Sequence, residues 1–284
     1  MHTIIWILFS LAALALLWML AIAPRTHSPE LLAELHDWIY AHRGFHDDAL
    51  GLPENSLGAF RRASGEGFAA ELDVHLTKDG QLAVMHDESL LRMCGIDRRV
   101  CDCTAAELRE YRLGNSQEGI PFLEDVLPYF EKTSPLLIEL KTCGKNAPEL
   151  CRRVMQTLDG YSGMYCIESF DPRVLIWLRR NRPKIVRGQL STNYTKHKEK
   201  LNPLLRFLLH NYLLNFITRP DFLAYNIEDY RDRSINLCRK IYDVTEFSWT
   251  VRNKEQQIRA DAMNSAIIFE LFDPRKDFNS QLES

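Results

Sequence analysis

The sequence of 284 residues lacks a strong net charge, because 35 Lys and Arg nearly balance 38 Asp and Glu and leave −3 at pH 7. A net charge so close to zero gives no general attraction to nucleic acid, and we expect no nucleic-acid partner. Glycine and proline are also scarce, with 13 and 12 residues, which excludes collagen-like and low-complexity chains. Long apolar runs are confined to the N-terminus, and the mean hydropathy of −0.24 excludes a polytopic membrane protein.

Cysteine is present without the pattern of a disulfide framework. The seven cysteines are an odd number, and their spacing fits a reducing compartment. Cys94, Cys101 and Cys103 could hold zinc, but no second Cys/His pair follows them at zinc-finger spacing. A zinc site is therefore disfavoured by the sequence.

The one long apolar run covers residues 4–23, where no residue is charged and only Ser10 is polar. As a helix with a rise of about 1.5 Å per residue, this run spans roughly 30 Å, the thickness of a bilayer core. Trp6 and Trp18 lie near its ends, where aromatic rings favour the membrane interface. We predict a transmembrane anchor over residues 1–24.

Two other interpretations of this run are weaker. A buried core helix would show a polar face, and this run has none. A cleaved signal peptide would begin with Lys or Arg, but residues 1–3 contain neither, and Pro24 follows the cleavage-like Ala-Ile-Ala. Arg25 is the nearest basic residue, so the positive-inside rule puts the rest of the chain in the cytoplasm.

The remainder divides into a linker, residues 25–37, and a single domain, residues 38–284, with the usual size of a (β/α)8 barrel, ~250 residues. Short apolar runs alternate with amphipathic stretches, which predicts a parallel sheet covered by helices. Residues 87–122 interrupt this alternation as an insertion, and residues 192–220 form a second irregular segment. The expected strands are Trp38–Ala41, Ala69–Val74, Leu82–His86, Leu136–Leu140, Met164–Glu168, Ile185–Leu190, Phe222–Tyr225, Phe247–Val251 and Ala266–Phe269. The expected helices are Ser56–Glu66, Leu123–Lys132, Ala147–Leu158, Pro172–Arg180, Arg231–Lys240 and Lys254–Asp261.

Polar residues gather where the predicted strands end, which is where barrel enzymes carry their sites. Three carboxylates from two strands would repel one another unless a hard cation such as Mg2+ or Ca2+ neutralised them. Two histidines suit a general acid and a general base, and two cations suit a phosphate. Asp87 alone is interpreted as a turn residue. The candidates are the carboxylates Glu71, Asp73 and Glu139, the histidines His42 and His86, and the cations Arg43 and Lys141.

These residues belong to motifs by which the chain resembles the glycerophosphodiester phosphodiesterase family. The motifs occur in the family's order from Tyr40 to Arg252. They are His42-Arg43-Gly44, Pro53-Glu54-Asn55-Ser56, Glu71-Leu72-Asp73-Val74, Thr77-Lys78-Asp79-Gly80, His86-Asp87, Ile120-Pro121-Phe122-Leu123-Glu124-Asp125, Ile138-Glu139-Leu140-Lys141, Ser169-Phe170-Asp171 and Trp249-Thr250-Val251.

The resemblance implies a TIM-type barrel with a small insertion after the second strand. It implies Glu71, Asp73 and Glu139 as metal ligands and His42 and His86 as the acid and base. Arg43 and Lys141 would hold the phosphate, while Phe170 and Trp249 would line the pocket beside the glycerol. The implied reaction begins with attack of the glycerol 2-hydroxyl on phosphorus, which releases an alcohol and forms a cyclic phosphate. Water then opens the cyclic phosphate to give sn-glycerol 3-phosphate.

The chain departs from the family's pattern in two places. Arg252 follows Trp-Thr-Val where the family often has Asn. The last strand lacks the usual Gly-rich stretch with Thr-Asp and Pro, and reads Ala-Ile-Ile-Phe-Glu-Leu-Phe-Asp-Pro over residues 266–274. The resemblance therefore does not predict the conformation of the last strand or of the pocket rim.

The segment 192–220 is basic and then apolar, as in a helix that lies in a membrane interface. A barrel helix with flanking lysines is an equal alternative. The interfacial interpretation would make a lysophospholipid or glycerophospholipid head group a second substrate class, behind soluble glycerophosphodiesters. The basic residues are Lys196, His197, Lys198 and Lys200, and the apolar core runs from Leu204 to Ile217.

Two other functions compete with the phosphodiesterase. A catalytically inactive, membrane-tethered binding protein could use the same barrel, but it would be free to lose the histidines and carboxylates that are all present here. A barrel phospholipase of the phosphoinositide or sphingomyelin type also uses two histidines and acidic ligands. The Pro-Glu-Asn-Ser and Glu-Leu-Lys motifs fit the first family better.

Overall fold

A computed structural model describes residues 2–25, 29–194, 196 and 201–276 of the chain. Its strands are β1 Tyr40–Ala41, β2 Ala69–Leu76, β3 Leu82–Val84, β4 Leu136–Lys141, β5 Tyr165–Ser169, β6 Arg187–Ser191, β7 Phe222–Asn226, β8 Thr245–Val251 and β9 Ala266–Phe269. Its α-helices are α1 His2–Ile22, α2 Leu31–His36, α3 Leu57–Gly65, α4 Leu91–Cys94, α5 Ala105–Arg109, α6 Leu123–Phe130, α7 Ala147–Leu158, α8 Pro172–Asn181, α9 Pro203–His210, α10 Asn215–Thr218, α11 Arg233–Tyr242 and α12 Lys254–Ala262. Short 3-10 helices are η1 Asp48–Leu50, η2 Val100–Asp102 and η3 Ile227–Asp229.

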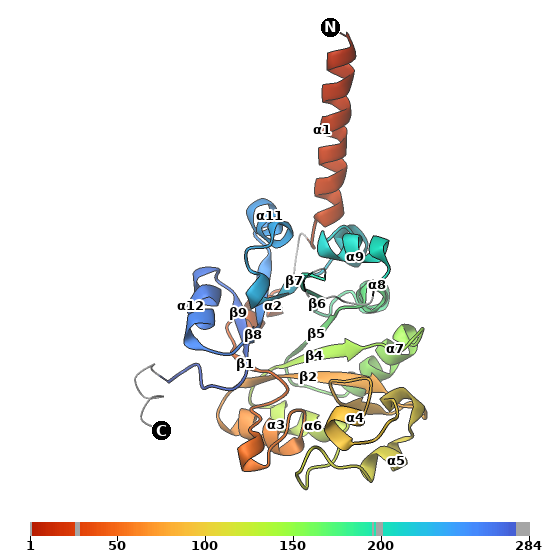
Figure 1. The fold of residues 1–284 in the computed structure, drawn as a ribbon, viewed down its shortest axis with the longest axis vertical. Coiled ribbons are helices and arrows are strands. Elements are labelled where there is room, and N and C mark those ends of the chain that lie inside the picture. The colour runs from red at the N-terminus through yellow and green to blue at the C-terminus, as the bar shows by residue number, and fades with distance from the viewer. Residues whose placement is uncertain (1, 26–28, 195, 197–200, 277–284) are drawn as a thin grey trace.

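Eight parallel strands close into a barrel, as predicted. Strand β1 pairs in parallel with β9 on one side and with β2 on the other, and this closes the sheet. Helices surround the strands, and the N-terminal helix extends away from them (Figure 1). Strand β3 pairs antiparallel with β2 and lies outside the ring, so nine strands in the described residues still give eight in the barrel.

Local signals in the sequence place the helix starts. Asp171 accepts a bond from the backbone N–H of Arg173, and Pro172 occupies the first turn of α8. The hydroxyl of Ser56 accepts from the N–H of Ala59 in the same way and begins α3. Predicted bounds therefore agree with the structure within a few residues, and those of α7 and β9 agree fully.

The barrel encloses one apolar layer and carries another on its outside. Inside, Phe222 and Phe247 stack at 4.4 Å between ring centroids. Helix α2 closes this layer, because Leu35 is fully buried and its carbonyl accepts a bond of 2.7 Å from the Tyr40 hydroxyl. Within the segment predicted as a linker, residues 31–36 thus pack against the barrel.

The insertion is a small unit with its own core. Helices α4 and α5 and the turn η2 pack around Leu90, Val100, Cys103 and Leu108, all fully buried. The unit follows the β2–β3 hairpin, so it rises from the carboxyl end of the barrel, next to the predicted site.

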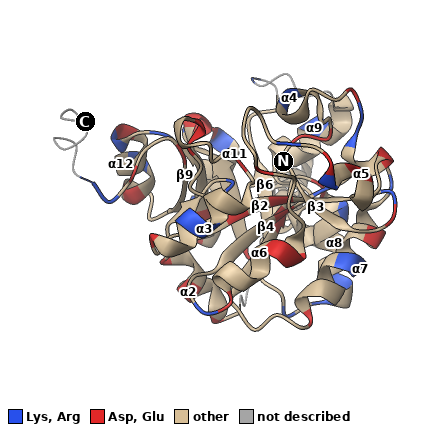
Figure 2. Ribbon diagram, turned by 90° about the horizontal axis from the view of Figure 1, so that it is seen from below, with Lys and Arg blue, Asp and Glu red and all other residues tan. Residues whose placement is uncertain are grey.

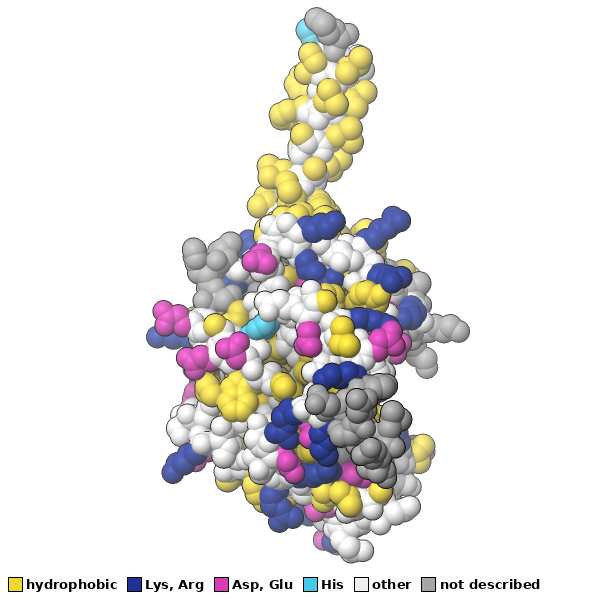
Figure 3. Space-filling view, turned by 90° about the vertical axis from the view of Figure 1, so that its left-hand side faces the viewer, with side chains coloured by type: hydrophobic (Ala, Val, Ile, Leu, Met, Phe, Trp, Pro, Cys, Tyr) yellow, Lys and Arg dark blue, Asp and Glu magenta, His cyan; other side chains and the backbone are white. Residues whose placement is uncertain are grey.

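Helix α1 is exposed along most of its length but docked at its foot. Figure 3 shows it as an apolar rod with no Lys, Arg, Asp or Glu, above a body of mixed charge. Its last residue, Ile22, is 1% exposed, and the Ile22 carbonyl accepts a bond of 2.9 Å from the Asn215 side chain. The Tyr242 hydroxyl donates to the Met19 carbonyl at 2.6 Å.

The segment 192–220 contains α9 and α10. Leu209 of α9 is buried, whereas Leu204 and Phe207 are 66% and 57% exposed. Tyr212, just beyond α9, packs in the same cluster as Ile22, so α9 lies beside the foot of α1 (Figure 1). Three of the four basic residues predicted for an interfacial helix, His197, Lys198 and Lys200, lie outside the described residues.

Candidate active site

A cavity of about 860 Å3 opens among the carboxyl ends of the barrel strands. Eight of the nine predicted site residues line it, and the ninth, Asp73, is buried beside them on β2. The structure therefore gathers the whole predicted set in one place. The eight are His42, Arg43, Glu71, His86, Glu139, Lys141, Phe170 and Trp249.

Three carboxylates cluster at this cavity, with Glu71 and Glu139 in its lining and Asp73 buried beside them. Glu71 and Asp73 alternate with buried apolar residues on β2, and Asp73 is in register with Glu139 on β4. One oxygen of each carboxylate lies within 4.8 Å of the other two. In Figure 2, Asp and Glu are red, and this colour lies on β2 and β4 at the centre of the molecule.

Burial and mutual repulsion set the ionisation of these groups. Burial, and then the charges of Asp73 and Glu139, raise the pKa of Glu71 well above its usual value. Burial raises the pKa of Glu139 to about 7 although Lys141 opposes it. Burial also opposes ionisation of Asp73, but Lys141 and other cations outweigh it and hold the Asp73 pKa well below its usual range. Three crowded oxygen ligands with this charge fit a hard divalent cation.

The two predicted phosphate-binding cations contact the same carboxylates. Lys141 Nζ lies 2.9 Å from Glu139 Oε2 and 3.1 Å from Asp73 Oδ1. The Arg43 guanidinium lies 3.6 Å from Asp73 Oδ2, and the Arg43 backbone N–H donates to Glu71 at 3.0 Å. Both side chains line the cavity, so both can reach an anion beside the carboxylates.

His42 is held by a carboxylate that the sequence did not single out. Its Nδ1 lies 2.6 Å from Glu270 Oε2, just beyond β9. This bond leaves Nε2 facing the cavity, 4.0 Å from Glu71. Burial lowers the pKa of His42 to about 4, although the hydrogen bond that its Nδ1–H donates to Glu270 opposes this shift. A neutral imidazole with one nitrogen free can accept a proton.

His86 forms a second histidine–carboxylate pair. Its Nδ1 lies 2.6 Å from Asp87 Oδ1, and Arg92 Nε donates to the other oxygen of Asp87 at 2.5 Å. Burial lowers the pKa of His86 as well. Asp87, interpreted from the sequence as a turn residue, instead orients His86 from the start of the insertion.

The Pro-Glu-Asn-Ser motif supports the site from behind. Glu54 accepts from Arg43 at 2.9 Å and from Arg92 at 2.6 Å. Asn55, in the left-handed conformation with φ 57°, donates its amide to Asp73 Oδ2 at 2.9 Å. The motif therefore fixes one cation and one carboxylate of the site.

Aromatic and aliphatic side chains form the other wall of the cavity. The rings of Phe170 and Trp249 meet edge to face at 5.6 Å. Leu205 and Leu209 of α9 line the same cavity. One wall can thus bind charge while the opposite wall accepts apolar groups.

Comparison with known proteins agrees with this geometry. The model of the glycerophosphoryl diester phosphodiesterase family matches residues 42–270, from the first site histidine to Glu270. The chain belongs to this family.

Members of the phosphodiesterase family match the chain over different lengths. A glycerophosphodiester phosphodiesterase of Bacillus altitudinis is 38% identical over 132 residues, which is 43% of this chain and only 53% of that protein. One from Caldanaerobacter subterraneus is 28% identical over 232 residues, or 78% of this chain and 88% of that protein.

Solved phosphodiesterase structures share the fold. The Oleispira antarctica phosphodiesterase in complex with the product sn-glycerol-3-phosphate superposes with a TM-score of 0.70 at 20% identity, over 89% of this chain and 99% of that one. A glycerophosphodiester phosphodiesterase from Parabacteroides distasonis gives 0.64 at 24% identity, over 82% and 92%.

The two departures from the family's pattern contact each other. Arg252 Nε donates to Glu270 Oε1 at 2.6 Å, while Glu270 Oε2 bonds His42. Glu168 of β5 is a further carboxylate of the cavity that was not predicted from the sequence, and burial raises its pKa well above the usual value. Its place as the next-to-last residue of a barrel strand was the available signal.

Proposed function

We propose that this chain hydrolyses glycerophosphodiesters to sn-glycerol 3-phosphate and an alcohol, with a divalent cation as cofactor. The convergence of two histidine–carboxylate pairs and three carboxylates on one cavity carries the proposal. Membership of the phosphodiesterase family supports it. A catalytically inactive binding protein would not need either pair to be intact.

The residues proposed to hold the cation are Glu71, Asp73 and Glu139. Their ligand atoms are all oxygens, and one of them, Asp73 Oδ1, is buried with Lys141 Nζ at 3.1 Å as a neighbour. This chemistry fits Mg2+ or Ca2+. Such a cation supplies Lewis-acid polarisation of a phosphoryl oxygen.

The histidines are proposed to move the protons. Each has Nδ1 bonded to a carboxylate, Glu270 for His42 and Asp87 for His86, which fixes the proton on Nδ1 and leaves Nε2 as the reactive atom. One histidine would remove the proton of the glycerol 2-hydroxyl as it attacks phosphorus. The other would protonate the departing alcohol. Water would then open the cyclic phosphate that this attack forms, which gives sn-glycerol 3-phosphate.

Binding of the substrate is proposed to use the cavity's two walls. Arg43 and Lys141 would hold the phosphate through charge-assisted hydrogen bonds. Phe170 and Trp249 would pack against the carbon side of the glycerol. Lys141 contacts the carboxylates and also lines the cavity, so its ammonium group could move from the carboxylates toward a bound phosphate.

The test is release of glycerol 3-phosphate from glycerophosphocholine with Mg2+, with Ca2+ and with EDTA. We expect activity with one of the cations, loss in EDTA, and a fall of roughly 100-fold or more in His42→Ala and in His86→Ala. Full activity in EDTA contradicts the cation. Unchanged activity in both histidine variants contradicts the mechanism.

We propose that residues 1–24 anchor the enzyme in a membrane, with the domain of residues 38–284 in the cytoplasm. The exposed apolar surface of α1 supports an anchor, since the part of this helix long enough to span a membrane is not buried against the rest of the protein. Arg25 and Arg219 lie at the foot of α1, on the side assigned to the cytoplasm. Extraction of the protein by sodium carbonate would contradict the anchor.

A second substrate class, lysophospholipids of the same membrane, is favoured by α9. This helix presents Leu205 and Leu209 to the cavity and Leu204 and Phe207 to solvent, beside the foot of α1. Replacement of Leu204 and Phe207 by Asp should lower activity on lysophosphatidylcholine vesicles and leave activity on glycerophosphocholine unchanged. Equal effects on both substrates would contradict the lipid role.

A further inference from the structure

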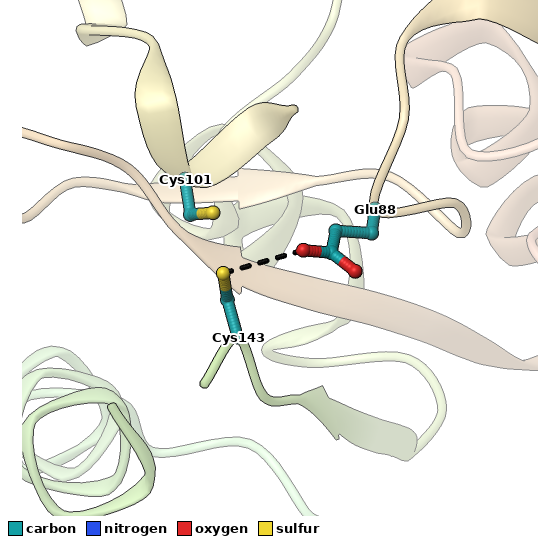
Figure 4. Close-up of side chains that lie close together, drawn as sticks. All are labelled: Glu88, Cys101 and Cys143. Atoms are coloured by element: carbon teal, nitrogen blue, oxygen red, sulfur yellow. Dashed lines mark hydrogen bonds between the residues drawn. The ribbon is translucent and has the colours of Figure 1, made fainter. Parts of the chain in front are cut away.

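Three side chains outside the cavity converge from three separate segments. Glu88 follows the His86 loop, Cys143 follows Lys141 beyond β4, and Cys101 belongs to η2 of the insertion. Figure 4 shows them pointing toward a common centre. One ligand atom of each lies within 4.8 Å of the other two, and Cys143 Sγ donates to Glu88 Oε1 at 3.3 Å.

We propose that Glu88, Cys101 and Cys143 bind a thiophilic divalent cation, of which Zn2+ is the standard example, at a site separate from the three carboxylates of the cavity. Two sulfur ligands favour such a cation over Mg2+ or Ca2+. With Zn–S of about 2.3 Å and Zn–O of about 2.0 Å in a tetrahedron, neighbouring sulfur and oxygen ligands lie roughly 3.5 Å apart. The observed separation of 3.3 Å between Cys143 and Glu88 is close to that value.

The surrounding charge is compatible with this occupant. Two thiolates and one carboxylate around a divalent cation leave one negative charge, and Arg99 Nη1 donates to Glu88 Oε1 at 3.3 Å. Cys101 and Cys143 are half-buried and Glu88 is exposed, so a cation from solvent can reach the site and a water molecule can complete it. Binding would release the two thiol protons.

This site was not evident from the spacing of the cysteines, because Cys101 and Cys143 lie far apart along the chain. Cys103, next in the sequence group, is fully buried in the insertion and donates to the Arg99 carbonyl instead. Cys101 finds its partner only after the chain has completed α6 and β4. A cation here would connect the insertion to the two loops that follow His86 and Lys141.

The experiment is titration of the reduced, full-length protein in detergent with Co2+, whose thiolate complexes absorb by sulfur-to-metal charge transfer. An all-oxygen site gives no such band, so the cavity carboxylates do not interfere. We expect one equivalent of Co2+ to produce the band and Zn2+ to displace it. The Cys101→Ser/Cys143→Ser double variant should abolish the band, and each single variant should weaken it. Glu88→Gln should weaken Co2+ binding by more than the ~10–100-fold that loss of an outer-shell partner costs.

Cys94→Ser is the matched control, since Cys94 is a half-buried cysteine of the same insertion outside the three-residue group, and it should leave the band unchanged. Absence of the band in the reduced wild-type protein overturns the proposal. A band of equal strength in the Cys101→Ser/Cys143→Ser double variant also overturns it. Purification of the protein with Cys101 and Cys143 joined in a disulfide, with no cobalt band after reduction, assigns the pair to redox chemistry instead.

Discussion

His42 Nδ1 lies 2.6 Å from Glu270 Oε2, and this contact joins the first strand of the barrel to the last. The Glu270 carboxylate fixes the imidazole orientation and would stabilise the imidazolium that forms when Nε2 takes a proton. Arg252 bonds the other oxygen of Glu270, so both departures from the family's pattern act on one histidine.

Replacement of Glu270 by Gln should lower kcat by roughly 10- to 1,000-fold, part of the 10^2–10^4-fold that a positioned acid or base contributes. KM should change little, because Glu270 does not line the cavity. Glu270→Asp, which keeps the charge, should recover part of kcat. The exposed Glu255→Gln is the control, and an unchanged kcat in Glu270→Gln would count against a positioning role.

Replacement of Asn55 by Ala should weaken binding of the activating cation by about 10- to 100-fold, because Asp73 loses the amide that orients it. It should also destabilise the protein, since Asn tolerates the left-handed backbone at φ 57° better than Ala does. Asn55→Asp keeps the shape but sets a like charge against Asp73. Cation titrations that gave equal affinities for wild type and both variants would refute this role.

Replacement of Glu71 by Gln should have opposite effects with and without the cation. Without it, the variant should have a higher Tm than the wild type, because burial beside Asp73 and Glu139 opposes ionisation of Glu71. With saturating Mg2+ or Ca2+, the wild type should gain about 3 kcal/mol at 100 times Kd, and the variant much less. Both expectations are checked by thermal unfolding of each protein, first in EDTA and then with saturating cation. Equal cation-induced shifts of Tm in the two proteins would argue against a cation held by Glu71.

Removal of residues 2–22 should destabilise the barrel even in detergent-free solution, because it uncovers the cluster that Ile22 shares with Tyr212 and Leu223. Loss of Ile22 and part of Trp18 from this contact should cost about 2–4 kcal/mol. Removal of residues 2–16 alone is the matched control and should leave the free energy of unfolding unchanged. Equal stabilities for the two truncated proteins would show that the docked turn contributes nothing.

The barrel and the gathering of the site were predictable because local rules determine them. The carboxyl ends of the strands in a parallel barrel meet at one face. The positions of His42, Asp73 and Glu139 in their strands were therefore enough to predict that they lie together. Capping residues such as Asp171 marked helix starts in the same local way.

Contacts between distant segments were not predictable. Glu270 bonds His42 only because β9 closes the barrel against β1, and Cys143 meets Cys101 only because the insertion folds over the β4 loop. Asp87 was accessible in principle, since it neighbours His86, but a strand-end Asp is more often a turn residue. Which side chains meet when the barrel closes depends on the register between neighbouring strands. The pattern of a single sequence does not specify that register.

The docked foot of α1 has a consequence for how substrate is supplied. Asn215, Tyr242 and Arg219 all donate to carbonyls between Met19 and Pro24, so these bonds fix the foot of the proposed anchor directly to the barrel. In a bilayer, the cavity would travel at constant height and face one direction relative to the surface. Its encounter rate with a lipid-borne substrate would then follow the number of molecules per unit area, and dilution of the surrounding solution would leave that rate unchanged.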